Sequence, residues 1–197
     1  MERYNPHKTA IWRREGAMTT PSRWLLQRVL TPGRIMPSSV LDFGAGKSHD
    51  EEMWGELPGV VARGYDRHPF PGFEHRAQRP PYVFGLVTMN YVLNILATEQ
   101  ERAEALLDAA TFVAPGGLLW VSTRSKSHVD QQGRGKRWGK TAEGVWISSP
   151  SRGTVQFGMD EEDIVALVQR SGLSGFVHNR VQGRPNSVTG CALFRRR

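Results

Sequence analysis

Two glycines follow a short apolar run that contains an acidic residue. The run Val40-Leu41-Asp42-Phe43 precedes Gly44-Ala45-Gly46-Lys47. The run has the composition of a buried strand, and glycines at positions i and i+2 permit a tight turn that a ligand can approach closely. An acidic helical stretch over 49–57 follows, and its first backbone N–H groups would lie at the same place. The pattern predicts a binding site at a strand–turn–helix junction.

A second acidic residue, Asp66, lies at the end of the next expected strand, over 60–66. A carboxylate at that position can accept hydrogen bonds from both hydroxyls of a ribose. The succession of strand, glycine turn, helix, strand and acid therefore predicts a nucleoside-cofactor site. The alternative is an ordinary tight turn, with Asp66 facing solvent.

Three cofactor classes compete for such a site. A P-loop requires a glycine five residues before Gly46, where the chain has Leu41, so a nucleoside triphosphate is excluded. A dinucleotide site requires a third glycine at position 49, which is His49, and its pyrophosphate would meet the acids at 50–52. S-adenosylmethionine (SAM) has no phosphate and carries a cationic sulfonium and ammonium, so Asp42 and these acids suit it. The sequence favours SAM as cofactor, with S-adenosylhomocysteine (SAH) as product.

Several segments resemble those of a known family. VLDFGAGKSHD (40–50), ARGYDRHPFP (62–71) and VTMNYVLNIL (87–96) are similar to segments of class I SAM-dependent methyltransferases. They most resemble the DNA-phosphorothioation-associated and phage-type methyltransferases, in which a basic residue, a small residue and then an Asp follow the glycines. An N-terminal KTAIWR stretch and the helix-forming ERAEALLDAA (101–110) are also typical of that group. The resemblance covers about residues 7–175.

The resemblance also implies roles for individual residues. Asp42 and the backbone of Gly44 and Gly46 would hold the methionine moiety of SAM, Asp66 would bind its ribose, and the end of the strand over 83–90 would line the methyl-transfer pocket. Two departures are Ser48, where a third glycine is commoner, and Gly85, where many relatives have Asp. The full set of expected cofactor contacts is Asp42, Phe43, Gly44, Ala45, Gly46, Lys47, Asp66, Arg67 and Asn90.

Asn90 and Tyr91 are the candidate catalytic residues. Methyl transfer from a sulfonium is a direct displacement, which needs alignment and exclusion of water rather than one obligatory residue type. Met89-Asn90-Tyr91-Val92 partly matches the Pro-Pro-aromatic motif of amino-directed DNA methyltransferases, without its two prolines. The amide oxygen could accept from an exocyclic amine, and the tyrosine could stack on a base. Alternatively, Asn90 contacts only the cofactor or has a structural role.

Other nucleophiles and ligands are less promising. Cys191 is the only cysteine, and its place in the last expected strand favours a small core residue over a catalytic thiolate. The six histidines lack the spacing of metal ligands, so we expect no metal site. His128 could serve as a general base, although a lone histidine in a loop is the simpler interpretation.

Positive charge is concentrated in three segments. The formal net charge is +7, and residues 1–34, residues 124–140 and the tail Arg195-Arg196-Arg197 carry +5, +5 and +3, leaving −6 on the remainder. Basic segments on an acidic body favour a polyanionic partner such as DNA or a nucleotide. The alternative is a mobile, solvated loop over the mouth of the site. The expected substrate contacts are Arg124, Lys126, Lys136 and Arg137 to phosphates, and Trp138, with Trp146 also flanking the run, to a base.

Alternating strands and helices must position these residues. We expect an N-terminal helical extension within 1–37, with a helix over 21–30 capped by Thr20, and the basic loop over 124–140. Strands are expected over 39–43, 60–66, 83–90 and 118–124, helices over 99–113 and 159–173, and a closing hairpin over 176–194. Trp12, Trp24 and Trp120 should pack in the core. The fold class is α/β, a three-layer sandwich with a Rossmann-like, seven-stranded mixed sheet and a C-terminal antiparallel hairpin.

Length and composition complete the expectations. The chain has 197 residues and 39% hydrophobic residues, which suit one methyltransferase domain over 1–197 in the cytoplasm, without a secretory signal or membrane span. The expected function is SAM-dependent methyl transfer to DNA or a nucleotide-like acceptor. The alternatives are a small-metabolite methyltransferase with a basic lid, and a non-catalytic SAM- or DNA-binding subunit of a modification or defence system.

Overall fold

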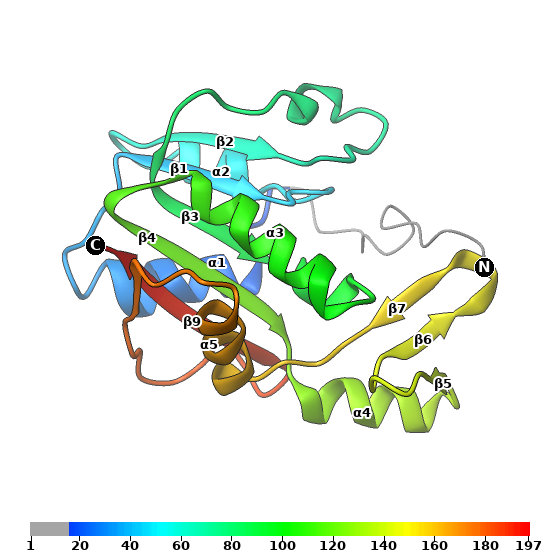
Figure 1. Ribbon diagram of the computed structural model, residues 1–197. Helices are drawn as coiled ribbons and strands as arrows, with labels where there is room; N and C mark the ends of the chain where they lie inside the picture. Colours follow the sequence, from blue (N-terminus) through cyan, green and yellow to red (C-terminus); the bar gives the residue numbers. More distant parts are fainter. Residues whose placement is uncertain (1–15) are drawn as a thin grey trace.

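A mixed sheet of six strands forms the middle layer of the molecule (Figure 1). The computed structural model describes residues 16–197. Four neighbouring strands are parallel, and the C-terminal hairpin adds one strand antiparallel to them and a last strand antiparallel to that one. The strand order is β2 (Val61–Tyr65), β1 (Ser39–Phe43), β3 (Phe84–Asn90), β4 (Val113–Arg124), β9 (Thr189–Arg196) and β8 (Phe176–His178). The expected fold class is confirmed, but this sheet has six strands in the described residues instead of seven.

Helices cover both faces of the sheet, because successive side chains of each strand point to opposite faces. On one face α3 (Glu99–Thr111) and α5 (Glu161–Arg170) pack against a core that includes Leu41 and Phe43. On the other, α1 (Thr20–Leu25), a π-helical turn (Leu26–Leu30) and α2 (Asp50–Gly55) pack against a core that includes Val40. The two cores make the three-layer arrangement (Figure 1).

The N-terminal helix begins one residue earlier than expected. The side chain of Thr19, rather than that of Thr20, accepts the backbone N–H of Ser22 and caps α1. The rings of Trp24 and Trp120 stack with centroids 5.8 Å apart, which confirms that both pack in the core. Trp12 and the first part of the expected extension lie outside the described residues.

The segment 124–140 is not a basic loop. It contains α4 (Lys126–Gly135), whose N-terminus is capped by the Ser125 hydroxyl, and then β5 (Gly139–Lys140). With β6 (Trp146–Ser149) and β7 (Thr154–Gln156), β5 forms a second, antiparallel sheet. A Cβ atom at Gly133 would lie 2.4 Å from the Trp146 ring, so the ring packs directly on the helix backbone. This contact with a residue downstream explains why the polar composition gave the wrong prediction.

The other elements agree with the sequence pattern, except that β4 begins at Val113, five residues before the expected strand over 118–124. The helices α3 and α5 each begin with a capping box, formed by Thr98 and Glu101 in α3 and by Asp160 and Asp163 in α5. Short 3-10 turns occupy Glu74–Ala77, Leu93–Ile95 and Pro150–Arg152. Cys191 is buried in the core, as expected. None of the helices between residues 16 and 197 is long and apolar enough to cross a membrane.

Candidate active site

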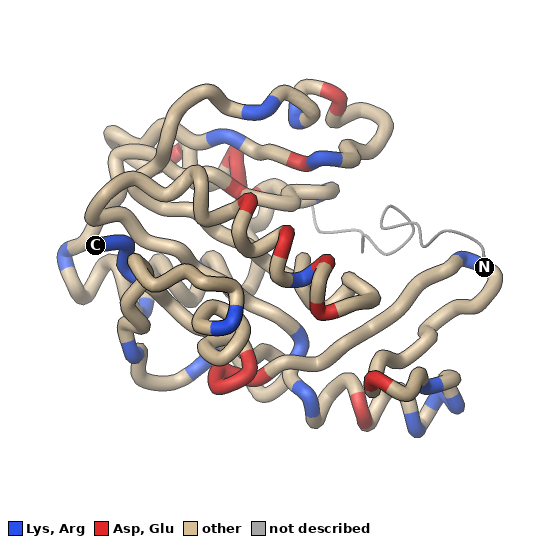
Figure 2. Tube along the Cα trace, viewed as in Figure 1, with Lys and Arg blue, Asp and Glu red and all other residues tan. Residues whose placement is uncertain are grey.

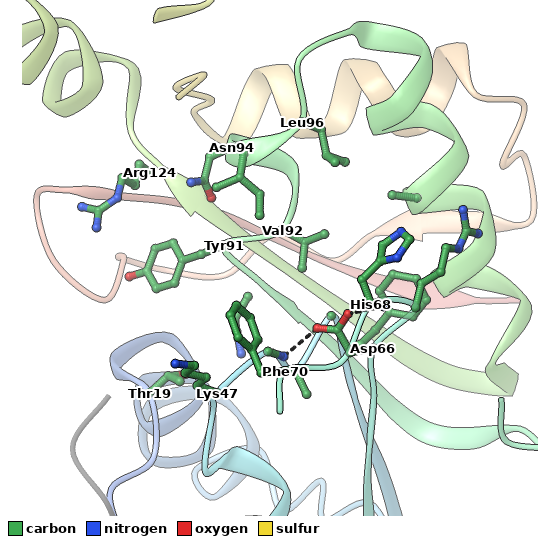
Figure 3. Close-up of a pocket in the computed structure, with 18 of the residues that line it drawn as sticks. Thr19, Lys47, Asp66, His68, Phe70, Tyr91, Val92, Asn94, Leu96 and Arg124 are labelled. Atoms are coloured by element: carbon green, nitrogen blue, oxygen red, sulfur yellow. Dashed lines mark hydrogen bonds between the residues drawn. The ribbon is translucent and has the colours of Figure 1, made fainter. Parts of the chain in front are cut away.

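A cavity of about 810 Å3 opens where the parallel strands β1 to β4 end (Figure 3). The carboxyl ends of parallel strands are the usual ligand-binding edge of an open α/β sheet. The walls come from the turn after β1, the loops after β2 and β3, the ends of β4 and β7, and the first parts of α1 and α3. Of the residues expected to act together, those that line the cavity are Phe43, Gly44, Ala45, Gly46, Lys47, Asp66, Arg67, Asn90, Tyr91 and Arg124.

The glycine turn is drawn tightly against the end of β2. The N–H groups of Gly44 and Ala45 both donate to the carbonyl oxygen of Tyr65, at 2.8 and 3.2 Å. Gly44 has φ +70°, and a Cβ atom there would lie 2.4 Å from Cγ2 of Val92. Only glycine fits this position without displacing Val92. The turn thus presents its backbone to the cavity.

Asp66 is fixed at the cavity wall by two backbone groups. The Gly46 N–H donates to Oδ2 and the His68 N–H donates to Oδ1, each at 2.8 Å (Figure 3). A carboxylate has about four acceptor positions, so both oxygens can accept further hydrogen bonds. Asp66 is therefore held in place and can still receive the hydroxyl groups of a ligand.

Arg76 supports the turn from the side away from the cavity, and the sequence analysis missed it. Its guanidinium is fully buried and donates to the carbonyl oxygens of Gly46 and Ser48, at 3.0 and 2.9 Å. It also forms an ion pair with Glu51 at 3.0 Å. The Pro-rich segment around Arg76 gave no signal of this role, because the contacts join residues 25 to 30 positions apart.

The acids that follow the turn do not face the cavity, contrary to expectation. Asp50 is fully buried and accepts hydrogen bonds from the backbone N–H and hydroxyl of Thr19 and from the Ser22 hydroxyl. Glu51 pairs with Arg76, and Glu52 contacts His49 at 2.6 Å. These acids are occupied by the protein itself, so they are not available to a cationic cofactor. Asp50 instead fastens the start of α1 beside the cavity.

Asn90 belongs to the same buried network. Its Nδ2 donates to the Ser22 hydroxyl at 2.8 Å and to Asp50 at 3.2 Å, and its Oδ1 accepts from the Ser122 hydroxyl at 2.7 Å. The residue is 7% exposed and lies at the cavity wall. Its side-chain amide is thus engaged with protein groups, which gives Asn90 a positioning role between α1, β3 and β4.

Tyr91 directly follows β3 with a left-handed backbone, φ +60°. Its N–H donates to the Ser122 carbonyl at 2.8 Å, and its hydroxyl lies 3.1 Å from that of Thr189. A left-handed conformation is costly for a residue with a Cβ atom, and such strain is often found at functional sites. The bend aims the ring at the cavity, where the Arg124 guanidinium lies 5.8 Å from its centroid.

Five expected contact residues do not line the cavity. Asp42 is 2% exposed inside the sheet, where it accepts from the Thr88 hydroxyl at 3.2 Å. Lys126 pairs with Asp163 at 2.7 Å, and that hydrogen bond raises its pKa. The remaining three, Lys136, Arg137 and Trp138, follow α4, where basic residues gather at the far end of the helix (Figure 2).

The cavity also has lining residues that the sequence analysis did not single out. Asn94 is 2% exposed and its Nδ2 donates to Gln156 at 3.1 Å, but its Oδ1 is buried without a partner among residues 16–197. Val92 and Leu96 add an apolar wall next to it (Figure 3). An orphaned buried acceptor is costly unless a ligand supplies the donor. The one signal available in the sequence was a polar residue, Asn94, between the apolar residues Leu93 and Ile95.

The fold matches those of solved SAM-dependent methyltransferases. The 1,6-didemethyltoxoflavin-N1-methyltransferase of Burkholderia thailandensis, solved with 1,6-didemethyltoxoflavin and SAH, has a TM-score of 0.62 and 16% identity over 92% of this chain and 79% of that one. The sugar N-methyltransferase KedS8 of a Streptoalloteichus species has a TM-score of 0.62 and 15% identity over 93% and 90%. The N-methyltransferase NodS of Bradyrhizobium japonicum, in complex with SAH, has a TM-score of 0.53 and 16% identity over 89% of this chain and 85% of that one. No protein-family model and no curated protein matches the sequence. The chain has the fold of the SAM-dependent methyltransferases.

Proposed function

We propose that the chain binds SAM in this cavity and transfers the methyl group to a small-molecule acceptor, with an amine as the favoured nucleophile. The proposal rests on one observation: the glycine turn and Asp66 lie together on one wall of the cavity, joined by a hydrogen bond. The fold adds support, because the three neighbours described above are N-methyltransferases.

The residues present fit the cofactor. The backbone of Gly44 to Gly46 can meet its amino-acid part, and Asp66 can accept from both ribose hydroxyls. A cavity of about 810 Å3 is within the usual range for small-ligand sites and leaves room for an acceptor. Asp42 lies beneath the turn rather than on the wall, so we assign it the positioning of β1 against β3 through Thr88.

Bound SAM would supply an electrophilic methyl carbon for direct displacement by a lone pair of the acceptor, with SAH as the leaving group. The protein must align that lone pair and keep water away. Val92 and Leu96 provide an apolar wall. Asn94 Oδ1 can accept an N–H of the acceptor and thereby orient its nitrogen. A secondary or tertiary ammonium product can release its proton to solvent after transfer.

DNA is the second candidate acceptor, favoured by the basic residues at the end of α4 (Figure 2). Arg134, Lys136, Arg137 and Lys140 are exposed there and could contact phosphates. They do not line the cavity, however, and only Arg124 of the expected phosphate contacts does. A DNA-phosphorothioation-associated role and a non-catalytic DNA-binding subunit both depend on this surface.

Transfer of labelled methyl groups separates these functions. The protein is incubated with SAM labelled at the methyl carbon, together with either ultrafiltered metabolites or duplex DNA. We expect label in the metabolite fraction, and none in DNA. If label appears in DNA, and the affinity of the protein for DNA falls steeply with salt, the methyl acceptor is DNA and not a small molecule. SAM binding without transfer to either fraction would contradict the enzymatic function.

A further inference from the structure

Arg124 lies at the end of the cavity remote from Asp66. Arg124 is the last residue of β4 and Asp66 follows β2, and β1 and β3 lie between these strands. Three strand spacings correspond to about 14 Å. Figure 3 shows Arg124 and Tyr91 on one side of the cavity and Asp66 and His68 on the other. If Asp66 marks the ribose, the Arg124 end is left for the acceptor.

The charge of Arg124 has no carboxylate within ion-pair distance in the described part of the chain. Two other cations of the region do form ion pairs, Lys126 with Asp163 at 2.7 Å and Arg67 with Asp108 at 3.0 Å. The Nη1 of Arg124 instead donates to Nε2 of His128, at 3.1 Å. Burial, and then the charges of Arg124 and Lys136, lower the pKa of His128, so it is neutral and can accept this bond. The guanidinium therefore keeps its full charge and four more N–H donors.

The side chain is also held in position for a ligand. His128 fixes one edge of the guanidinium from α4, and the Tyr91 ring lies 5.8 Å from its central carbon. The ring is itself fixed, because the Tyr91 N–H binds the Ser122 carbonyl and its hydroxyl contacts Thr189. A guanidinium held by two neighbours loses little freedom when it binds an anion.

Further positive charge lines the same cavity. Lys47 lies on the side of the cavity away from His68 (Figure 3), with its ammonium 4.7 Å from the centroid of the Phe70 ring. Arg23 of α1 is also a lining residue. Acidic lining residues, Glu101 and Glu104, come from α3. The cavity is therefore polar at both ends, with a cationic group at the end remote from Asp66.

We propose that the methyl acceptor carries an anionic group, a carboxylate or a phosphate, and that Arg124 binds it. Both anions accept two parallel N–H bonds from a guanidinium. Asn94 Oδ1, the buried acceptor on the same wall, receives an N–H donor of the same molecule. The substrate class is thus a small amine that also bears a carboxylate or a phosphate. This inference rests on the proposed function, since it names the acceptor of that reaction.

Binding of the bare anions tests the inference without knowledge of the acceptor. Inorganic phosphate and acetate are titrated calorimetrically into the SAH-saturated full-length protein, for wild type, Arg124→Gln, Arg124→Lys and the control Arg152→Gln. Arg152 is an exposed arginine in the turn Pro150–Arg152, outside the cavity. We expect at least one of the two anions to bind wild type and Arg152→Gln, with roughly tenfold weaker binding to Arg124→Gln. Arg124→Lys keeps the charge but loses the parallel N–H donors of the guanidinium, so its affinity for the anion should be intermediate.

The two probes distinguish the two sources of the anion. Preference for phosphate supports a phosphorylated acceptor, and preference for acetate supports a carboxylate. Equal affinity of wild type and Arg124→Gln, or no anion binding to wild type, would overturn the inference. Thermal unfolding shows whether Arg124→Gln folds, and Arg124→Lys decides the matter if it does not. SAH is titrated into every variant without the anions: failure of wild type to bind SAH would refute the proposed function, whereas loss of anion binding alone would not.

Discussion

The backbone N–H of Gly46 donates to the carboxylate of Asp66 at 2.8 Å, which joins the turn after β1 to the loop after β2. One residue thus closes the cavity at one end and fixes the glycine turn beside it. The His68 N–H, on the other carboxylate oxygen, prevents Asp66 from rotating away. The shape of the candidate cofactor site therefore depends on Asp66 before any ligand arrives.

Gly44→Ala should damage both stability and cofactor binding. The new Cβ atom would lie 2.4 Å from Val92, in a backbone with φ +70°. We expect a loss of about 2–4 kcal/mol in the free energy of unfolding, and weaker SAH binding. Gly172→Ala is the matched control, because Gly172 has φ +74° with nothing within 4 Å of the added atom. It should cost about 1 kcal/mol and leave SAH affinity unchanged. Equal effects of the two substitutions in urea unfolding would mean that the Val92 contact is unimportant.

Arg76→Met should weaken the turn from beneath. The substitution leaves the carbonyl oxygens of Gly46 and Ser48 without their buried donors. We expect a loss of about 3 kcal/mol in the free energy of unfolding and reduced SAH affinity. Arg79→Met removes a half-exposed arginine paired with Asp108 and should cost less than about 1 kcal/mol. Calorimetric titration with SAH and denaturant unfolding measure the two effects. If Arg76→Met binds SAH as tightly as Arg79→Met and is as stable, Arg76 does not support the glycine turn.

Asp50→Asn should loosen the start of α1. An amide supplies one acceptor where the carboxylate receives the Thr19 N–H and two hydroxyl groups. We expect a loss of about 2 kcal/mol in the free energy of unfolding, and faster amide hydrogen exchange over residues 17–25. Glu52→Gln, an exposed change in the same short helix, should alter neither. Unchanged exchange over 17–25 in the Asp50 variant would show that the network does not hold α1.

Acid should destabilise the protein partly through His128. Its pKa is lowered by burial and by the charges of Arg124 and Lys136, so the unfolded state binds this proton more readily than the folded state. The stability that neutral His128 allows is complete above its ordinary pKa and is lost as the pH falls through that value towards the folded pKa. We expect the stability of wild type relative to His128→Gln to decrease between about pH 7.5 and pH 5. A constant difference in the free energy of unfolding across this range would contradict the lowered pKa.

The elements that build the cavity were predictable where local signals exist. The strand before Gly44, the turn itself and Asp66 follow from residue type and spacing. The capping pairs Thr98–Glu101 and Asp160–Asp163 are short-range patterns, and α3 and α5 begin within two residues of the starts expected for the helices over 99–113 and 159–173. The sequence could also place Asn90 and Tyr91 at a strand end, since that needs only the apolar run before them.

What the sequence could not reveal depends on contacts between distant positions. The partners of Asn90 include Ser22, 68 residues away, and no local pattern reveals that this bond holds the amide in place. The helix over 126–135 has a polar composition, and its packing requires Trp146 from a later strand. Likewise, the acids after the glycine turn have the charge that suits a cation, but Thr19, Ser22 and Arg76 occupy them. Charge and spacing identify candidates, and tertiary partners decide which of them face the ligand.

The most direct test of the cofactor assignment is a calorimetric titration of SAM into wild type, Asp66→Ala, Asp66→Asn and the control Glu162→Ala. Glu162 is an exposed carboxylate on α5, away from the cavity. We predict binding at one site per chain for wild type and the control, and roughly tenfold weaker binding or worse for both Asp66 variants. Absence of SAM binding by wild type, or equal affinity in all four proteins, would contradict the assignment of the cavity as a SAM site.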